Sequence, residues 1–186
     1  MVPLITRRLV LTAGGTLAAG LTVRKPLAAD GLGDLARALV VTDPPVAAPD
    51  IGFVSADGKE HRLAEFLGHG MVINLWATWC VPCVAEMPAL AALSKTLAPD
   101  DIAVLPLSSD RGGAGVVQAF YQDHGIGGLP VLLDPKGAAA RSWHARGIPT
   151  SVIIDKKGRE RGRVEGSVDW ASLQAAALVR KLVAGA

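Results

Sequence analysis

The stretch MVINLWATWCVPCVAEMP, residues 71–88, decides the fold class of this 186-residue chain. Its first part, Met71 to Trp76, is an apolar run that contains β-branched residues and has the length of a buried strand. Two cysteines follow in Cys80-Val81-Pro82-Cys83, and from Cys80 to Leu97 the apolar spacing is helical. We therefore expect a buried strand that leads directly into a helix, with the cysteine pair at the start of the helix.

Strand and helix patterns alternate on both sides of this stretch. A hairpin is indicated around Asp57-Gly58, with Gly52 to Val54 and His61 to Leu63 as its arms. Further strands are predicted at residues 101–107, 129–133, 150–154 and 159–164, and further helices at 115–124, 138–145 and 169–182. This order predicts an α/β fold whose mixed central sheet is covered by helices on both faces.

The first 29 residues have the composition of an export signal. Basic residues come first, and Leu9 to Leu21 is an apolar run too short to span a bilayer, which needs about 20 residues. Thr6 to Leu11 resembles the twin-arginine export motif, and Leu27-Ala28-Ala29 offers small residues for cleavage. An ordinary secretory signal that happens to carry two arginines is the alternative.

We therefore expect an exported, periplasmic protein, which would be tethered to the membrane if the leader were not cleaved. The expected divisions are an export signal at 1–29, a linker at 30–48 and one domain at 49–186. The linker includes Thr42-Asp43-Pro44-Pro45, which is expected to stop any short helix that begins before it.

The charge balance argues against a nucleic-acid partner. The chain has 19 basic and 17 acidic residues, but four of the basic ones lie within the first 29 residues. The expected mature part therefore has 15 basic residues against 17 acidic ones. It lacks the basic surplus that attracts nucleic acid.

The two cysteines allow a structural, a metal-binding or a redox role. A structural disulfide across so small a ring would restrict the unfolded chain by about 2 kcal/mol, against about 4.7 kcal/mol for a 100-residue loop. Four-cysteine zinc sites are excluded by the count. A redox role fits better, because the free amides and the dipole at a helix N-terminus favour a thiolate at Cys80. We expect Cys80 to attack a substrate disulfide and the more buried Cys83 to resolve the mixed disulfide; Pro82 suits the first helical turn.

A family resemblance rests on these residues. Asn74 to Cys83, followed by Glu86-Met87-Pro88, resembles the TlpA/ResA/CcmG group of periplasmic thioredoxin-like proteins, and Ser109 to Gly113 is most similar to the TlpA branch. The resemblance implies a thioredoxin-like fold from about Pro49 onward and thiol-disulfide oxidoreductase activity. We expect no cofactor and no metal. Thr150 stands where the CcmG branch has a glutamate, which weakens an assignment to that branch.

The resemblance also implies a role for Glu86, three residues after Cys83. It would exchange protons with the resolving thiol, since a carboxyl desolvated by burial can accept a proton near neutral pH. Asn74 occupies the strand position at which thioredoxins have an aspartate, and this substitution strengthens the case for Glu86. A solvated glutamate in the first turn of the helix is the alternative.

Gly147 to Thr150 is similar to the substrate loop of the family. Pro149 would be a cis-proline facing the cysteine pair, so that Ile148 offers its backbone to an extended client segment. The residues alone do not predict this isomer, since only about 5–6% of X–Pro bonds in folded proteins are cis. Ile148 resembles the residue of reducing members, and Trp79 would provide a flat apolar platform. The candidate client-binding residues are therefore Trp79, Pro82, Ile148 and Pro149.

The expected function is that of a protein-disulfide reductase. By resemblance, its clients would be copper-site assembly proteins and the copper A subunit of cytochrome oxidase, or else apocytochrome c. The oxidised form would have to be recharged, because the periplasm is kept oxidising. By the same resemblance, the electrons would come from a membrane protein of the DsbD/CcdA kind. The alternatives are a thiol oxidase that donates its disulfide and a copper chaperone on a related fold, although such chaperones generally use CxxxC with a histidine. Whether Arg111-Gly112-Gly113 contacts a partner or is only a turn stays open.

Overall fold

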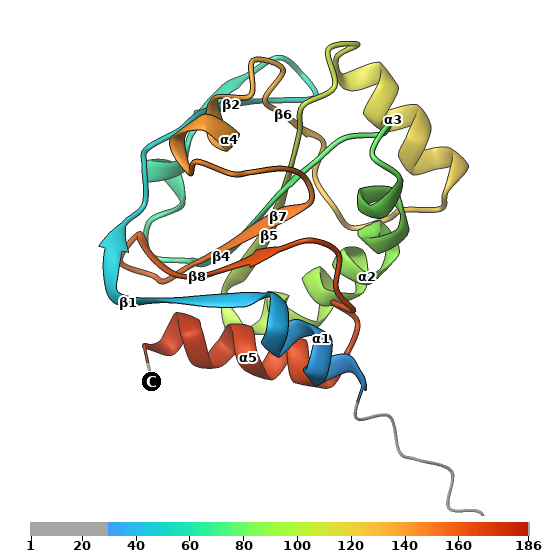
Figure 1. Ribbon diagram of the computed structural model, residues 1–186. Helices are drawn as coiled ribbons and strands as arrows, with labels where there is room; N and C mark the ends of the chain where they lie inside the picture. Colours follow the sequence, from blue (N-terminus) through green and yellow to red (C-terminus); the bar gives the residue numbers. More distant parts are fainter. Residues whose placement is uncertain (1–29, 186) are drawn as a thin grey trace, which may run out of the picture.

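The computed structural model describes residues 30–185 and shows a central sheet flanked by helices (Figure 1). The expected export signal at 1–29 lies outside the described residues. The sheet has eight strands in the order β1-β8-β7-β4-β5-β6-β2-β3. No helix within residues 30–185 combines the length and apolarity needed to cross a membrane.

The elements alternate along the chain much as the sequence indicates. The strands are β1 (Leu39–Ala47), β2 (Gly52–Ser55), β3 (Glu60–Arg62), β4 (Gly70–Trp76), β5 (Ile102–Ser108), β6 (Leu132–Leu133), β7 (Thr150–Ile154) and β8 (Arg159–Glu165). The helices are α1 (Asp30–Ala38), α2 (Val81–Leu97), α3 (Ala114–Asp123), α4 (Ala138–Ser142) and α5 (Leu173–Ala184), with 3-10 turns η1 (Leu63–Phe66) and η2 (Ala98–Asp100).

The sheet is mixed, as predicted, and β4 lies at its centre with every residue buried. β4 pairs in parallel with β5 and antiparallel with β7, and β5 pairs in parallel with β6. The crossovers β4-α2-β5 and β5-α3-β6 carry the helices α2 and α3. Because parallel crossovers are right-handed, both helices lie on the same face.

Two apolar clusters cover the two faces of the sheet, because successive side chains of β4 point in opposite directions. Val72 and Trp76 belong to the cluster that includes residues of α1, α2, α3 and α5. Met71, Ile73 and Leu75 belong to the cluster that includes residues of η1 and α4. The expected sheet with helices on both faces is confirmed.

Several boundaries differ from the expected ones for local reasons. α5 begins at Leu173 rather than at Asp169, since the Ser172 side chain caps it by accepting a hydrogen bond from the Ala175 amide at 3.2 Å. α4 ends at Ser142, just before His144 adopts a left-handed φ of 50°. β6 is shorter than the predicted strand 129–133, which contains Pro130, a residue without an amide to donate.

Residues 30–48, expected as a linker, are largely helix and strand. Leu35 of α1 is completely buried, and β1 pairs antiparallel with β8. The pairing is interrupted between Val41 and Val46, where the two prolines lie. An edge strand tolerates such an interruption, because its outer side donates to no neighbouring strand. Most of the expected linker therefore belongs to the folded domain.

Candidate active site

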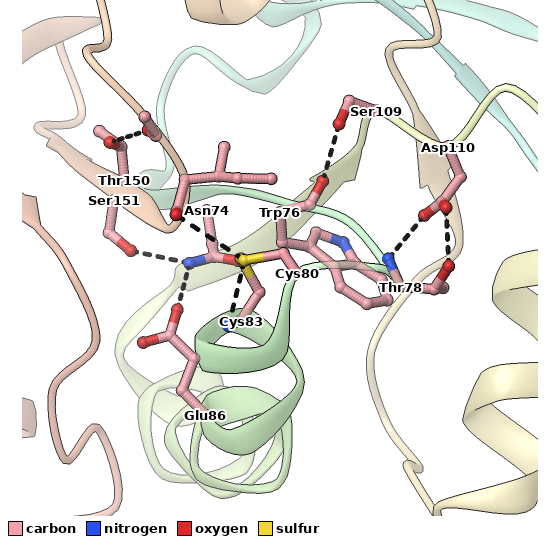
Figure 2. The surroundings of a disulfide bond; sticks show 12 residues. Asn74, Trp76, Thr78, Cys80, Cys83, Glu86, Ser109, Asp110, Thr150 and Ser151 are labelled. Carbon is pink, nitrogen blue, oxygen red and sulfur yellow. Dashed lines mark hydrogen bonds between the residues drawn. A yellow bond between two sulfur atoms is a disulfide. The ribbon is translucent and has the colours of Figure 1, made fainter.

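The cysteine pair lies where β4 delivers the chain to α2. Cys80 is the N-cap residue of α2, with extended backbone angles, and its Sγ accepts a hydrogen bond from the Cys83 amide at 3.3 Å. Pro82 occupies the first helical turn, as expected. The two cysteines are disulfide-bonded (Figure 2). The sulfur of Cys80 is thus held at the helix N-terminus, where the free amides favour a thiolate.

The two sulfurs differ in accessibility. Cys83 is completely buried, whereas Cys80 is 7% exposed and lies between two strongly exposed neighbours, Trp79 and Val81. Pro82 is exposed as well. An incoming disulfide therefore reaches Cys80 before Cys83, which is the order that the sequence predicts.

The loop before β7 faces the pair from the other side. The Ile148–Pro149 bond is cis, as the resemblance implies. The Ile148 carbonyl oxygen lies 3.7 Å from Cys80 Sγ, and the Ile148 amide donates no hydrogen bond within residues 30–185. The loop is fixed from both ends, because Thr150 Oγ1 donates to the Gly147 carbonyl at 2.7 Å and the Gly166 amide donates to the Pro149 carbonyl at 2.9 Å. A backbone edge is thus available next to Cys80 Sγ.

Glu86 is buried beneath the disulfide and is only 3% exposed (Figure 2). Burial raises the pKa of its carboxyl to about 7, against the opposing effect of the Asn74 side chain, whose Nδ2 donates to Oε1 at 2.9 Å. Ser167, the Val168 amide and Trp170 also face the carboxyl and favour its charged form, yet Oε2 makes no hydrogen bond of good geometry within the described residues. The alternative of a solvated glutamate is therefore wrong.

Comparisons with known proteins agree with this geometry. The AhpC/TSA family model matches residues 44–161. The chain belongs to the AhpC/TSA family. The thiol-disulfide oxidoreductase ResA of Geobacillus thermodenitrificans is 28% identical over 121 residues, which cover 65% of this chain and 68% of that protein. The thioredoxin-like protein YneN of Bacillus subtilis is 35% identical over 113 residues, which cover 60% of this chain and 65% of that protein.

A solved structure extends the likeness to three dimensions. The pneumococcal exposed lipoprotein thioredoxin of Streptococcus pneumoniae superposes with a TM-score of 0.59 and 29% identity, over 70% of this chain and 99% of that one. The predicted thioredoxin-like fold is confirmed, and so is the resemblance to the group that contains ResA. This AhpC/TSA-family protein is a thiol-disulfide oxidoreductase.

Asp110 is a buried residue near this site to which the sequence analysis gave no role. Its carboxylate accepts hydrogen bonds from the Thr78 amide at 2.9 Å, the Thr78 hydroxyl at 2.7 Å and the Ser108 hydroxyl at 2.6 Å. The Ser109 amide donates to the Trp76 carbonyl at 3.0 Å. The loop after β5 therefore braces the turn that presents Cys80. Its position just after the strand predicted at 101–107 could have pointed to Asp110. The carboxyl ends of the parallel strands β4 and β5 lie at the same edge of the sheet, so Asp110 comes close to the turn after β4.

Asn74 also does more in this AhpC/TSA-family protein than replace an aspartate. Besides the bond to Glu86, its Nδ2 donates to Ser151 Oγ of β7 at 3.0 Å, so that one side chain joins β4, α2 and β7. Asn74 and Ser151 are directly opposite each other in the antiparallel pair. This pairing depends on strand register, which the sequence did not fix.

Proposed function

We propose that this protein is an exported, periplasmic protein-disulfide reductase. The Cys80 thiolate attacks one sulfur of a client disulfide, and the other client sulfur leaves as a thiolate that takes up a proton. Glu86 then accepts the proton of the Cys83 thiol, and Cys83 attacks Cys80 Sγ in the mixed disulfide. This attack breaks the mixed disulfide, and the second client sulfur leaves as a thiolate that takes up a proton. The client has then gained two electrons from the cysteine pair and leaves as a dithiol, and a Cys80–Cys83 disulfide remains.

The observation that carries this proposal is the placement of the two sulfurs relative to one buried carboxyl. Cys80 keeps 7% of its surface exposed at the start of α2, whereas Cys83 is completely buried one turn before Glu86 on the same helix. Residues three apart on a helix are neighbours on its surface. A carboxyl with a pKa of about 7 exchanges protons readily at neutral pH, which the second step needs.

Client binding is proposed to use the exposed rim around Cys80. Trp79 is 68% exposed and provides an apolar surface beside the sulfur. Pro82 is part of the same exposed turn. Across from it, the loop at Ile148 and Pro149 offers a carbonyl and an amide to an extended client segment, in the manner of an added strand.

The cellular partners belong to the same proposal. An exported reductase in an oxidising compartment must be recharged, and we assign this step to a membrane donor of the DsbD/CcdA kind. The clients we propose are copper-site assembly proteins and the copper A subunit of cytochrome oxidase, with apocytochrome c as the second class. The description of the pneumococcal relative as an exposed lipoprotein supports a location outside the cytoplasm.

A redox titration against glutathione tests the direction of electron flow. A reductase has a reduction potential near that of thioredoxin, about −270 mV, whereas a disulfide donor of the DsbA kind lies near about −120 mV. A value near the second figure would overturn the proposal in favour of a thiol oxidase.

Trapping with a Cys83→Ser variant tests the clients. Without the resolving sulfur, the mixed disulfide on Cys80 persists and can be isolated from the periplasm together with its client. The proposal expects copper-site or cytochrome proteins in the trapped complexes, and the recovery of neither class would contradict it.

A further inference from the structure

A groove opens beside the nucleophile, between the loop 109–112 and the turn 135–137. Trp79 and Val116 give it an apolar surface, and both side chains are exposed. Its volume of about 610 Å³ lies within the range of sites that hold small molecules. In Figure 2 the braced loop with Ser109 and Asp110 lies on the opposite side of Cys80 from Glu86. The groove is thus separate from the buried proton-exchanging cluster.

Hydrogen bonds hold both walls of the groove, the first to the turn that presents Cys80 and the second to the end of β5. The first wall is held by the bonds from Thr78 to Asp110 and from Ser109 to Trp76. In the second wall, the Asp134 amide donates to the Ser108 carbonyl at 2.7 Å, and the Asp134 carboxylate accepts from the first amides of α4. The groove is therefore preformed at a fixed position relative to the sulfur, which lowers the entropy cost of binding there.

The groove carries positive charge without a matching acid. Arg111 and Lys136 are both exposed and line it, and neither lies within 4.0 Å of a carboxylate among residues 30–185. Asp110, the acidic residue of the lining, is 4% exposed and has its oxygens engaged by Thr78 and Ser108. The accessible charge of the groove is therefore positive.

We propose that this groove takes the segment of a client protein that flanks the attacked cysteine, and that it favours acidic side chains in that segment. Arg111 and Lys136 would pair with the carboxylate, and Trp79 would pack against the neighbouring part of the chain. In this proposal Arg111, whose role the sequence leaves open, contacts the partner. This inference depends on the proposed reductase function and adds a client preference to it.

Two matched disulfide peptides test the preference. They share one sequence and differ only in carrying Glu or Gln on each side of one cysteine. The rate constants for their reduction by the reduced protein are measured by acid quench and mass spectrometry. The wild type should reduce the Glu peptide about threefold faster at low salt, the size expected for one or two exposed ion pairs. The ratio should approach one at about 1 M salt, where the Debye length is about 3 Å.

The double variant Arg111→Gln/Lys136→Gln should reduce the Glu and Gln peptides at equal rates at low salt, so that the ratio of their rate constants falls to one. The matched control Lys157→Gln/Lys181→Gln removes two exposed charges outside the groove lining and should keep it. Equal rates in the wild type, a ratio kept by the groove variant or a ratio lost in the control would each overturn the inference. Failure of the wild type to reduce even the neutral bis(2-hydroxyethyl) disulfide would instead overturn the proposed reductase function.

Discussion

Two carboxyl groups flank the active-site turn, equally buried but differently bonded (Figure 2). Glu86 is 3% exposed and Asp110 is 4% exposed. Asp110 accepts three hydrogen bonds from Thr78 and Ser108, which offset the cost of burying its charge. Glu86 accepts one side-chain hydrogen bond, from Asn74, and its Oε2 has no partner of good geometry within residues 30–185. The comparison teaches that the number of donors, and not burial alone, distinguishes a carboxyl that braces a turn from one that is suited to exchange protons.

Asp110→Ala should have the largest effect, and it acts on stability. Its removal leaves the Thr78 amide and two hydroxyl groups without their acceptor, which should lower the free energy of unfolding by about 3 kcal/mol. Urea denaturation measures the loss. Asp123→Ala, an exposed aspartate of α3, is the matched control and should change the free energy of unfolding by less than about 0.5 kcal/mol. Equal effects of the two substitutions would show that Asp110 is no brace.

Glu86→Gln should change the pH dependence of stability. The pKa of Glu86 is raised from 4.5 to about 7 in the folded protein, so the folded state binds more protons between these values. The contribution of Glu86 to stability should therefore be greatest below about pH 4.5 and fall by roughly 1–3 kcal/mol as the pH rises through 7. Glu86→Gln should lack this fall.

Urea denaturation of the oxidised protein over this pH range gives the test. At each pH, the difference in the free energy of unfolding between the wild type and Glu86→Gln gives the contribution of Glu86. The contributions of other carboxyls cancel in this difference, such as that of Asp155, whose pKa is lowered by its Arg159 partner. Parallel curves for the two proteins would contradict the raised pKa of Glu86.

The same substitution should slow the reduction of client disulfides at neutral pH by about tenfold, since the resolving thiol loses its proton acceptor. The rate of the wild type should rise with pH around 7, and that of Glu86→Gln should not. Glu65→Gln, at an exposed position of η1, is the control for loss of a carboxylate. Unchanged kinetics between about pH 5 and 9 would remove Glu86 from the mechanism.

The smallest effect is expected at Asn74. Asn74→Ala removes a donor to Glu86, so the pKa of the carboxyl should rise further and move the midpoint of the pH–rate profile upward by roughly half a unit to one unit. Ser151→Ala is the matched control, because it removes the other bond of Asn74 and leaves the bond to Glu86 in place. A midpoint that moves equally in both variants would mean that the donor is not what tunes Glu86.

The centre of the fold could be predicted from the sequence because its signals are local. A largely apolar run gives β4, and the turn with Pro82 gives the start of α2. The order of the two sulfurs follows from the same signals. The position of Glu86 one turn later follows from helical spacing, whereas its role came from the family resemblance.

The remaining features depend on contacts between distant parts of the chain. β1 contains two prolines, and only its edge position beside β8 makes a strand compatible with them. The brace joins Asp110 to Thr78 across the edge where β4 and β5 end, and the bond from Asn74 to Ser151 depends on strand register. A groove formed by two loops more than 20 residues apart likewise leaves no local pattern.

The reactivity of Cys80 tests the central claim most directly, namely that a sulfur at the N-terminus of α2 is the nucleophile. The reduced protein is treated with iodoacetamide at about pH 6, and peptide mapping follows each cysteine separately. Cys80 should be alkylated at least about tenfold faster than free cysteine, whose thiol has a pKa of about 8.5, while Cys83 stays unmodified. A Cys80 that reacts no faster than free cysteine, or a Cys83 that reacts first, would contradict the account.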